Sequence, residues 1–263
     1  MTRRIRMIVQ YDGTAYAGWQ TQPNGLAVQE RLEQELYKIT GEAIRLHASG
    51  RTDSGVHARA QVAHFDTQSR IPGPKFAYAL NCGLPPDIRV AFSQEAPADF
   101  HARFQVARKH YRYALWQSPH GNPFLRDTAL HIHHPLDRSL LEQAAAMVVG
   151  EHDFGAFKAA GITPKTTWRT VFESRWVQGE CPGLLYYHVA GSGFLYNMVR
   201  ILVGTMLEIG GGRRPLAAME EALASGNRED AGPTAPAHGL MLWRVEYPGF
   251  DTEDYVQWPG QLE

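Results

Sequence analysis

The sequence predicts an α+β fold built from two ferredoxin-like halves, each with the element order β-α-β-β-α-β. Three observations carry this prediction: strand-like alternation of apolar residues, helices with apolar residues at helical spacing, and partial repetition of the element order in the second part of the chain. We expect the two antiparallel sheets to join into one extended sheet flanked by helices, with the active-site cleft between the halves. The expected domains are residues 1–104 and 105–263.

In the first half, strands are expected at 4–13, 43–49, 60–67 and 87–96, and helices at 25–41 and 74–83. The first helix is the clearest, because its apolar side chains recur at helical spacing and Gly41 follows the last of them, as is common at helix ends. These apolar side chains are Val28, Leu32, Leu36 and Ile39.

The second half begins with a strand at 107–117, and a helix at 136–150 follows. Asp137 is the expected N-cap of that helix, because a short side chain with a carboxylate can accept a hydrogen bond from the free amides of the first turn. A hairpin follows at 168–178 and 183–194, then helices at 195–212 and 215–226 and a last strand at 239–249. Long loops are expected at 118–127 and 159–167.

Composition limits the classes of function. The chain has 263 residues, of which 44% are hydrophobic and 20% charged, as in folded globular proteins. No apolar run approaches the roughly 18 residues that span a bilayer, and the N-terminus lacks the apolar core of a signal peptide. Cys82 and Cys181 are far apart and indicate neither a disulfide framework nor a zinc ribbon. We therefore expect a cytoplasmic protein without a membrane partner.

The net charge of −1 argues against a nucleic-acid partner. However, most basic residues are arginine, whose planar guanidinium suits phosphate groups. A basic cleft balanced by acidic outer helices is compatible with both facts.

The stretch "GRTDSGVHA" at 50–58 is the strongest candidate for chemistry. Arg51, Asp53 and His57 crowd together around Gly55, and a nearby guanidinium lowers the pKa of a carboxylate. A permanently ionised Asp53 suits a nucleophile or an electrostatic stabiliser and does not suit a general acid. The structural alternative is a polar hairpin whose aspartate bonds turn amides.

Other readings of the polar motifs are weaker. An aspartic protease needs a second Asp-Ser/Thr-Gly, which is absent, and the adjacent arginine opposes a shared proton. Ser54 has no GxSxG elbow around it. The "HIHH" cluster (His131, His133 and His134) lacks a nearby Cys or carboxylate to complete a metal site, so no metal is expected.

Two further segments carry candidate residues. On a strand at 107–117, Tyr111 and Tyr113 would share one face and Arg112 would lie on the other, where a cation and an aromatic ring could grip an RNA phosphate and a base. The alternative is that one tyrosine faces the core. Arg200 interrupts an apolar helix face, so it either pairs with a carboxylate or extends its head group to solvent.

Taken together, "YDGTAYAGWQ", "GRTDSGVHA", "FLYNMVRILVG" and "APAHGLMLWRVEYP" closely resemble the TruA family of tRNA pseudouridine synthases, in order and over essentially the whole chain. The resemblance implies isomerisation of uridine to pseudouridine at positions 38, 39 and 40 of the tRNA anticodon stem-loop. It also implies a homodimer that binds tRNA, and no cofactor or metal.

By match to the family motifs, Asp53 is the expected catalytic aspartate and Arg51 its neighbour. Tyr111 is expected to pack on the target base, and Arg200 to pair with the aspartate. Arg51, His57 and Arg112 are further expected substrate contacts. The alternative function is a non-catalytic tRNA-binding or RNA-chaperone protein.

Overall fold

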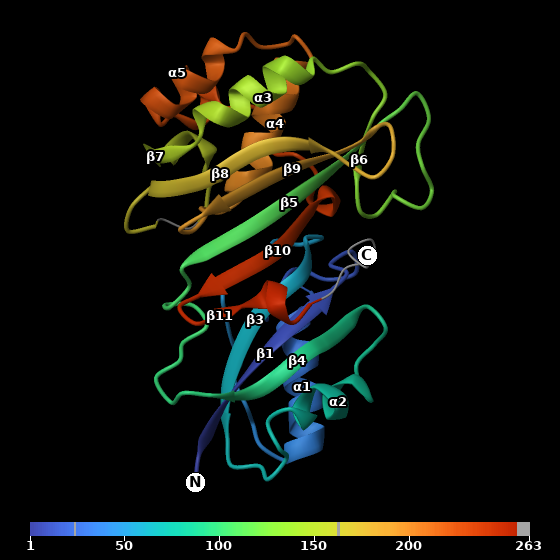
Figure 1. Ribbon diagram of the computed structural model, residues 1–263, viewed down its shortest axis with the longest axis vertical. Helices are drawn as coiled ribbons and strands as arrows, with labels where there is room; N and C mark the ends of the chain where they lie inside the picture. Colours follow the sequence, from blue (N-terminus) through green and yellow to red (C-terminus); the bar gives the residue numbers. More distant parts are fainter. Residues whose placement is uncertain (24, 162–163, 257–263) are drawn as a thin grey trace. The chain divides into compact units, whose positions relative to one another are not determined.

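The computed structural model describes residues 1–23, 25–161 and 164–256. The expected loop at 159–167 and the expected domain end at 263 therefore lie partly outside the described residues. The chain divides into two compact units. The N-terminal unit contains Met1–Ala107 and the residues from Met241 on, and the C-terminal unit contains Arg108–Leu240 (Figure 1).

In the N-terminal unit, the sheet has β1 between β4 and β3, and β1 is antiparallel to both. The short strand β2 pairs with the far end of β3. Fully buried apolar side chains from β1, α1, β3 and α2 form the core, as Ile5, Leu32, Phe65 and Phe76 illustrate. The elements are β1 (Arg3–Tyr11), α1 (Val28–Thr40), β2 (His47–Ala48), β3 (His57–Thr67), α2 (Lys75–Asn81) and β4 (Ile88–Ala96).

The strand β10 (Leu240–Tyr247) belongs largely with the N-terminal unit, although it is distant in sequence. Met241 and Leu242 pair in parallel with His57 and Ala58 at the start of β3. The first break between the two compact units falls after Ala107, and the residues from Met241 on group with the N-terminal unit. The expected domains 1–104 and 105–263 stay a prediction.

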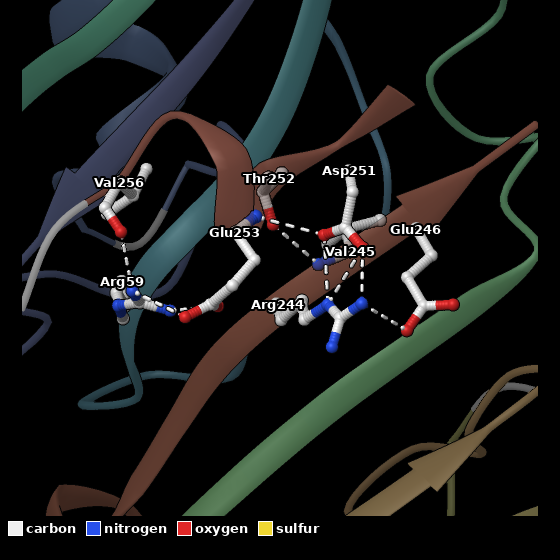
Figure 2. A network of polar contacts seen from close by, with 8 residues as sticks. All are labelled: Arg59, Arg244, Val245, Glu246, Asp251, Thr252, Glu253 and Val256. Carbon is white, nitrogen blue, oxygen red and sulfur yellow. Dashed lines mark hydrogen bonds and ion pairs between the residues drawn. The ribbon is translucent and has the colours of Figure 1, made fainter. Parts of the chain in front are cut away.

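A network of polar contacts joins residues 244–256 to Arg59 on β3 (Figure 2). The side chain of Arg59 is fully buried, and its Nη1 lies 2.6 Å from Oε2 of Glu253. Its Nη2 donates to the carbonyl of Val256 at 2.6 Å. Arg244 on β10 pairs with Asp251 of β11 (Phe250–Asp251), and the 3-10 helix η4 (Thr252–Asp254) follows. Because the guanidinium of Arg59 is buried, its carboxylate partner is a structural requirement.

In the C-terminal unit, β5, β9, β8 and β7 are adjacent in that order, and β6 pairs in parallel with β5. Helix α4 is apolar almost all round and is buried along most of its length. The elements are β5 (Arg108–Gln117), β6 (Leu130–Ile132), α3 (Arg138–Met147), β7 (Gly150–Asp153), η1 (Gly155–Phe157), β8 (Trp168–Gln178), β9 (Leu184–Gly191), α4 (Met198–Gly210), α5 (Ala217–Ser225), η2 (Arg228–Asp230) and η3 (Ala237–Gly239).

The mixed α+β class is confirmed, and the two expected helix-end signals are too. Gly41 ends α1 with φ 74°, and the carboxylate of Asp137 accepts from the amide of Leu140 at 3.1 Å. The strand expected at 43–49 was wrong in length, since only His47–Ala48 is extended in a ladder. The two ferredoxin-like halves stay a prediction, because β6 and β7 add strands to the C-terminal unit. Among the described residues, no helix combines the length and hydropathy needed to cross a bilayer.

Candidate active site

Asp53 lies half-buried in the loop that connects β2 to β3, and we call residues 50–57 the aspartate loop. The amide of Val56 donates to the carbonyl of Asp53 at 3.1 Å, which closes a tight turn. Gly55 has φ 76°, a conformation that residues with a side chain rarely adopt, so the turn favours a glycine at this position. The turn therefore fixes the backbone that carries the carboxylate.

A second segment, residues 12–19, supports the aspartate loop, and we call it the cradle loop. The carbonyl of Tyr16 accepts from the amide of Gly55 and from the hydroxyl of Ser54, each at 3.2 Å. The amide of Trp19 donates to the carbonyl of Thr52 at 3.2 Å. These bonds hold the residues on both sides of Asp53, so its carboxylate starts from a defined position.

The backbones of the two loops can approach closely because Gly13 and Gly18 of the cradle loop have no side chain at the contact. A Cβ on Gly18 would lie 2.5 Å from the carbonyl oxygen of Thr52 and 3.0 Å from the carbonyl carbon of Asp53. A Cβ on Gly13 would lie 2.1 Å from the carbonyl oxygen of Val56. Gly18 also has φ 93°. A larger residue at either position would push the aspartate loop away.

His57 is only 2% exposed and contacts the start of the cradle loop. Its Nδ1 accepts from the amide of Gly13 at 3.0 Å and lies 3.1 Å from Oδ1 of Asp12. Burial alone would raise the pKa of Asp12, but hydrogen bonds from Thr14 and the nearby His57 ring lower it overall. In the structure His57 supports the loop, and its expected contact with substrate stays a prediction.

Arg51 is exposed at the start of the aspartate loop, two residues before Asp53. The loop base beneath it is fixed, because the side-chain amide of Gln61 donates to the carbonyl of Gly50 at 2.8 Å. The other end of that amide accepts from the hydroxyl of Ser49 at 2.6 Å. An exposed guanidinium on a backbone that is held in place is suited to contact a large polyanionic ligand.

In the C-terminal unit, the alternation expected along β5 is confirmed. Tyr111 and Tyr113 are both buried, and the Tyr111 ring packs edge-to-face on Phe194 with centroids 5.1 Å apart. The hydroxyl of Tyr113 donates to the carbonyl of Pro236 at 2.8 Å, and burial raises its pKa well above the ordinary value. Arg112 is on the opposite face. Tyr113 is thus a core residue, as one of the alternatives required.

Arg112 lies over another aromatic ring. Its guanidinium carbon is 4.1 Å from the ring centroid of Tyr186, whose hydroxyl donates to Glu180 at 2.9 Å. Burial raises the pKa of Tyr186 to about 12, against the opposing effect of Arg112. This cation–π contact orients the arginine on the sheet face.

Arg200 lies in the first turn of α4, and its guanidinium is held by neighbours. Nε donates to the carbonyl of Ala235 at 2.7 Å, and Nη1 donates to Oδ1 of Asn197 at 2.9 Å. Asn197 has φ 60°, the one positive value at a non-glycine among the described residues. The apolar face expected around Arg200 is confirmed by the burial of Leu195, Val199, Leu202 and Val203. The helix start therefore fixes the direction of the arginine.

The structure places the candidate residues in two groups: Arg51, Asp53 and His57 in the N-terminal unit, and Tyr111, Arg112 and Arg200 in the C-terminal unit. Pairing of Asp53 with Arg200 stays a prediction. Sequence reasoning did not identify the supporting residues, namely the glycines of the cradle loop, Phe194 and Asn197. The two glycines of "YDGTAYAGWQ" were the available signal, since small residues mark close backbone approach.

The histidine cluster of the C-terminal unit does not form a metal site. The ring of His131 instead lies 2.8 Å from the carbonyl of Ser118, and the rings of His133 and His134 meet edge-to-face. Within residues 1–23, 25–161 and 164–256, no group of three or more His, Cys, Asp or Glu side chains is arranged to hold a metal ion.

Comparison with known proteins adds a family resemblance to this geometry. A model of the family described as tRNA pseudouridine synthase matches residues 7–105 and 144–248. The chain is 46% identical over 243 residues to a protein of Syntrophotalea carbinolica, covering 92% of the chain and 96% of the relative. It is 43% identical over 245 residues to a protein of Acetivibrio thermocellus, covering 93% of the chain and all of the relative. Both relatives are named tRNA pseudouridine synthase A.

Proposed function

Because the chain belongs to the tRNA pseudouridine synthase family, and is therefore an isomerase that acts on uridine in tRNA, we propose that its targets are positions 38, 39 and 40 of the anticodon stem-loop. The motifs shared with the TruA family support this choice of positions. We further propose two ferredoxin-like domains, a homodimer in which one tRNA contacts both subunits, a cytoplasmic location, and a reaction without cofactor or metal.

The reaction breaks the bond between N1 of uracil and C1′ of ribose, turns the base, and joins C5 to C1′. C5 then loses its proton and N1 gains one, so the product is an isomer of the substrate. We assign the central role to Asp53. Its ionised carboxylate either attacks C1′, as the nucleophile of a retaining glycosidase does, or stabilises the positive charge there. Removal of the 2′ proton to give a glycal is the second route, and both routes lead to the same product.

The other candidate residues have roles in this scheme. Arg51 and Arg200 would keep Asp53 ionised and orient it, because a guanidinium favours the charged form of a carboxylate. Tyr111 would pack on the target base once that base has left the helical stack. Arg112 would contact the RNA backbone, and His57 would contribute by holding the aspartate loop.

The observation that favours this proposal most directly is that the cradle loop holds the aspartate loop in place. Bonds from the cradle loop hold Thr52 and Gly55 on either side of Asp53, and Gly18 allows the close approach. A carboxylate that must reach C1′ of an extruded nucleotide needs a fixed starting position, since small displacements reduce rates strongly. A simple polar hairpin would not require two glycines in a second loop.

The test uses tRNA tritiated at C5 of uridine, with release of tritium into water as the readout. The wild type should release tritium from positions 38, 39 and 40, and Asp53→Ala should release none while still binding tRNA. Asp127→Ala is the matched control, because Asp127 is also a half-buried carboxylate with an arginine close in sequence, Arg126, whose Nε lies 3.1 Å from Oδ2 of Asp127. Full activity of Asp53→Ala would refute the mechanism. Tight tRNA binding by a wild type that releases no tritium would favour the non-catalytic alternative.

A further inference from the structure

Four aromatic rings of the N-terminal unit form a continuous cluster, which we call the ring cluster (His47, His64, His101 and Phe104). The rings of His47 and His64 are stacked at 5.1 Å, and His64 meets His101 edge-to-face at 4.8 Å. His101 is stacked on Phe104, with centroids 4.2 Å apart and planes 30° apart. The cluster thus runs from a buried ring on β3 to an exposed ring in the segment after β4.

Phe104 is 76% exposed, although its position is well fixed. Its own amide and that of Arg103 donate to Nδ1 of His101, at 3.4 and 3.1 Å. The amide of Ala102 donates to Nδ1 of His64 at 3.1 Å. These bonds hold the backbone that carries Phe104 against the histidine rings. An exposed aromatic ring is thereby held in place before any ligand arrives, which lowers the entropic cost of binding.

The charge around Phe104 indicates what it could bind. The guanidinium of Arg103 lies 5.8 Å from the Phe104 ring centroid. Burial, with Arg4 and the other histidines nearby, lowers the pKa of His64 to about 4, and burial also lowers the pKa of His101. Two carboxylates are close to Arg4: Asp66, whose Oδ1 accepts from Nε of Arg4 at 2.8 Å, and Asp99. At neutral pH the exposed end is therefore a phenyl ring stacked on the neutral imidazole of His101, with the Arg103 guanidinium beside it.

We propose that Phe104 is a stacking platform for an unpaired base of the RNA substrate, separate from the target uridine, with Arg103 on the adjoining phosphate. This inference rests on the proposed function for the identity of the ligand. Every base offers a π face beside an anionic phosphate, which matches an aromatic ring beside a guanidinium. The flanking Arg103 and Gln105 are polar and exposed, so the apolar area is one ring and too small for a stable protein interface.

The test measures the Kd of tRNA for substitutions at Phe104 by fluorescence anisotropy. Phe104→Ala and Phe104→Leu should raise Kd about 5- to 150-fold, the range found when one stacked base loses its aromatic partner. Phe104→Trp should keep the wild-type Kd. Tyr78→Ala is the matched control and should also keep it, because Tyr78 is 70% exposed beside a cation, Lys75 at 5.0 Å, but lies outside the ring cluster.

Three binding results would overturn the proposal: an unchanged Kd in Phe104→Ala, a wild-type Kd in Phe104→Leu, or an equal loss of affinity in Tyr78→Ala. Dissociation of an oligomer by Phe104→Ala in sedimentation would also overturn it, because the ring would then contact a second copy of the chain. The single-turnover rate of tritium release at saturating tRNA should be unchanged in Phe104→Ala. If the wild type releases no tritium, the proposed function fails, while the binding comparison still decides the role of Phe104.

Discussion

Gly18→Ala should show that the position of the aspartate loop controls activity, because the variant should lose far more activity than its loss of thermal stability explains. The added Cβ would lie 2.5 Å from the carbonyl oxygen of Thr52, and ordinary contact begins near 3.4 Å. Thr52 must therefore move by up to about 0.9 Å, the difference between these two distances. Asp53 is the next residue, so its carboxylate moves with that carbonyl group.

Two separate magnitudes follow from this geometry. A misplacement of about 1 Å in a catalytic group can reduce the rate about 100-fold, so we expect kcat/KM to fall by about two orders of magnitude. The positive φ of 93° adds backbone strain of about 1–3 kcal/mol for any residue with a Cβ. For a protein of this size, that strain lowers Tm by about 3–10 °C.

Gly41→Ala is the matched control, because Gly41 has φ 74° and nothing lies within 4 Å of its added Cβ. It should lose a similar amount of Tm and keep wild-type tritium release. Gly13→Ala tests the opposite combination, a steric clash without a positive φ. Its added Cβ would lie 2.1 Å from the carbonyl oxygen of Val56. Steady-state tritium release and thermal unfolding are measured on all variants. Wild-type kcat/KM in Gly18→Ala, or an equal loss of activity in Gly41→Ala, would refute the argument.

Two further predictions concern stability. Glu253→Ala should lower the free energy of unfolding by about 3 kcal/mol, because it removes the carboxylate that binds the buried Arg59. The control Glu95→Ala removes an exposed carboxylate beside Arg3 and should lower the free energy of unfolding by less than about 1 kcal/mol. Equal losses of the two variants in urea titrations would contradict this prediction. His64 has a folded pKa of about 4, below the ordinary 6.5, so the unfolded chain takes up the proton first and stability falls as pH drops from about 6.5 to 4. The loss of unfolding free energy between pH 7 and about pH 4.5 should be smaller in His64→Gln than in the wild type, and equal losses would exclude His64 as the cause.

Most of the fold followed from local patterns. The spacing of Val28, Leu32 and Leu36 predicted α1, because an apolar stripe at helical spacing needs a core to cover it. The strand expected at 43–49 was too long, since Ile44 and Leu46 are buried in a connection with only a two-residue ladder. Local apolar content did not distinguish a buried loop from a strand, because long-range pairing decides between them.

The site was predicted less completely than the fold. Asp53 and Arg51 stood out because they crowd together with His57 near glycines, and their roles in the site stay predictions. The cradle loop was not identified, since its backbone bonds, from Trp19 to Thr52 and from Gly55 to Tyr16, join residues about 33 and 39 positions apart. Backbone hydrogen bonds do not depend on the type of side chain, so they leave no pattern in the amino-acid sequence. Only the glycines at 13 and 18 marked the place.

The bond between Arg59 and Glu253 joins residues 194 positions apart in the sequence. During synthesis, β3 and the aspartate loop leave the ribosome long before β10 and Glu253 are made. A nascent chain that stops before residue 240 lacks Glu253 and Val256, which bind the Arg59 guanidinium, and it lacks the parallel neighbour for the start of β3. Interrupted translation therefore yields a polypeptide that lacks these contacts to β3, the strand that directly follows the aspartate loop.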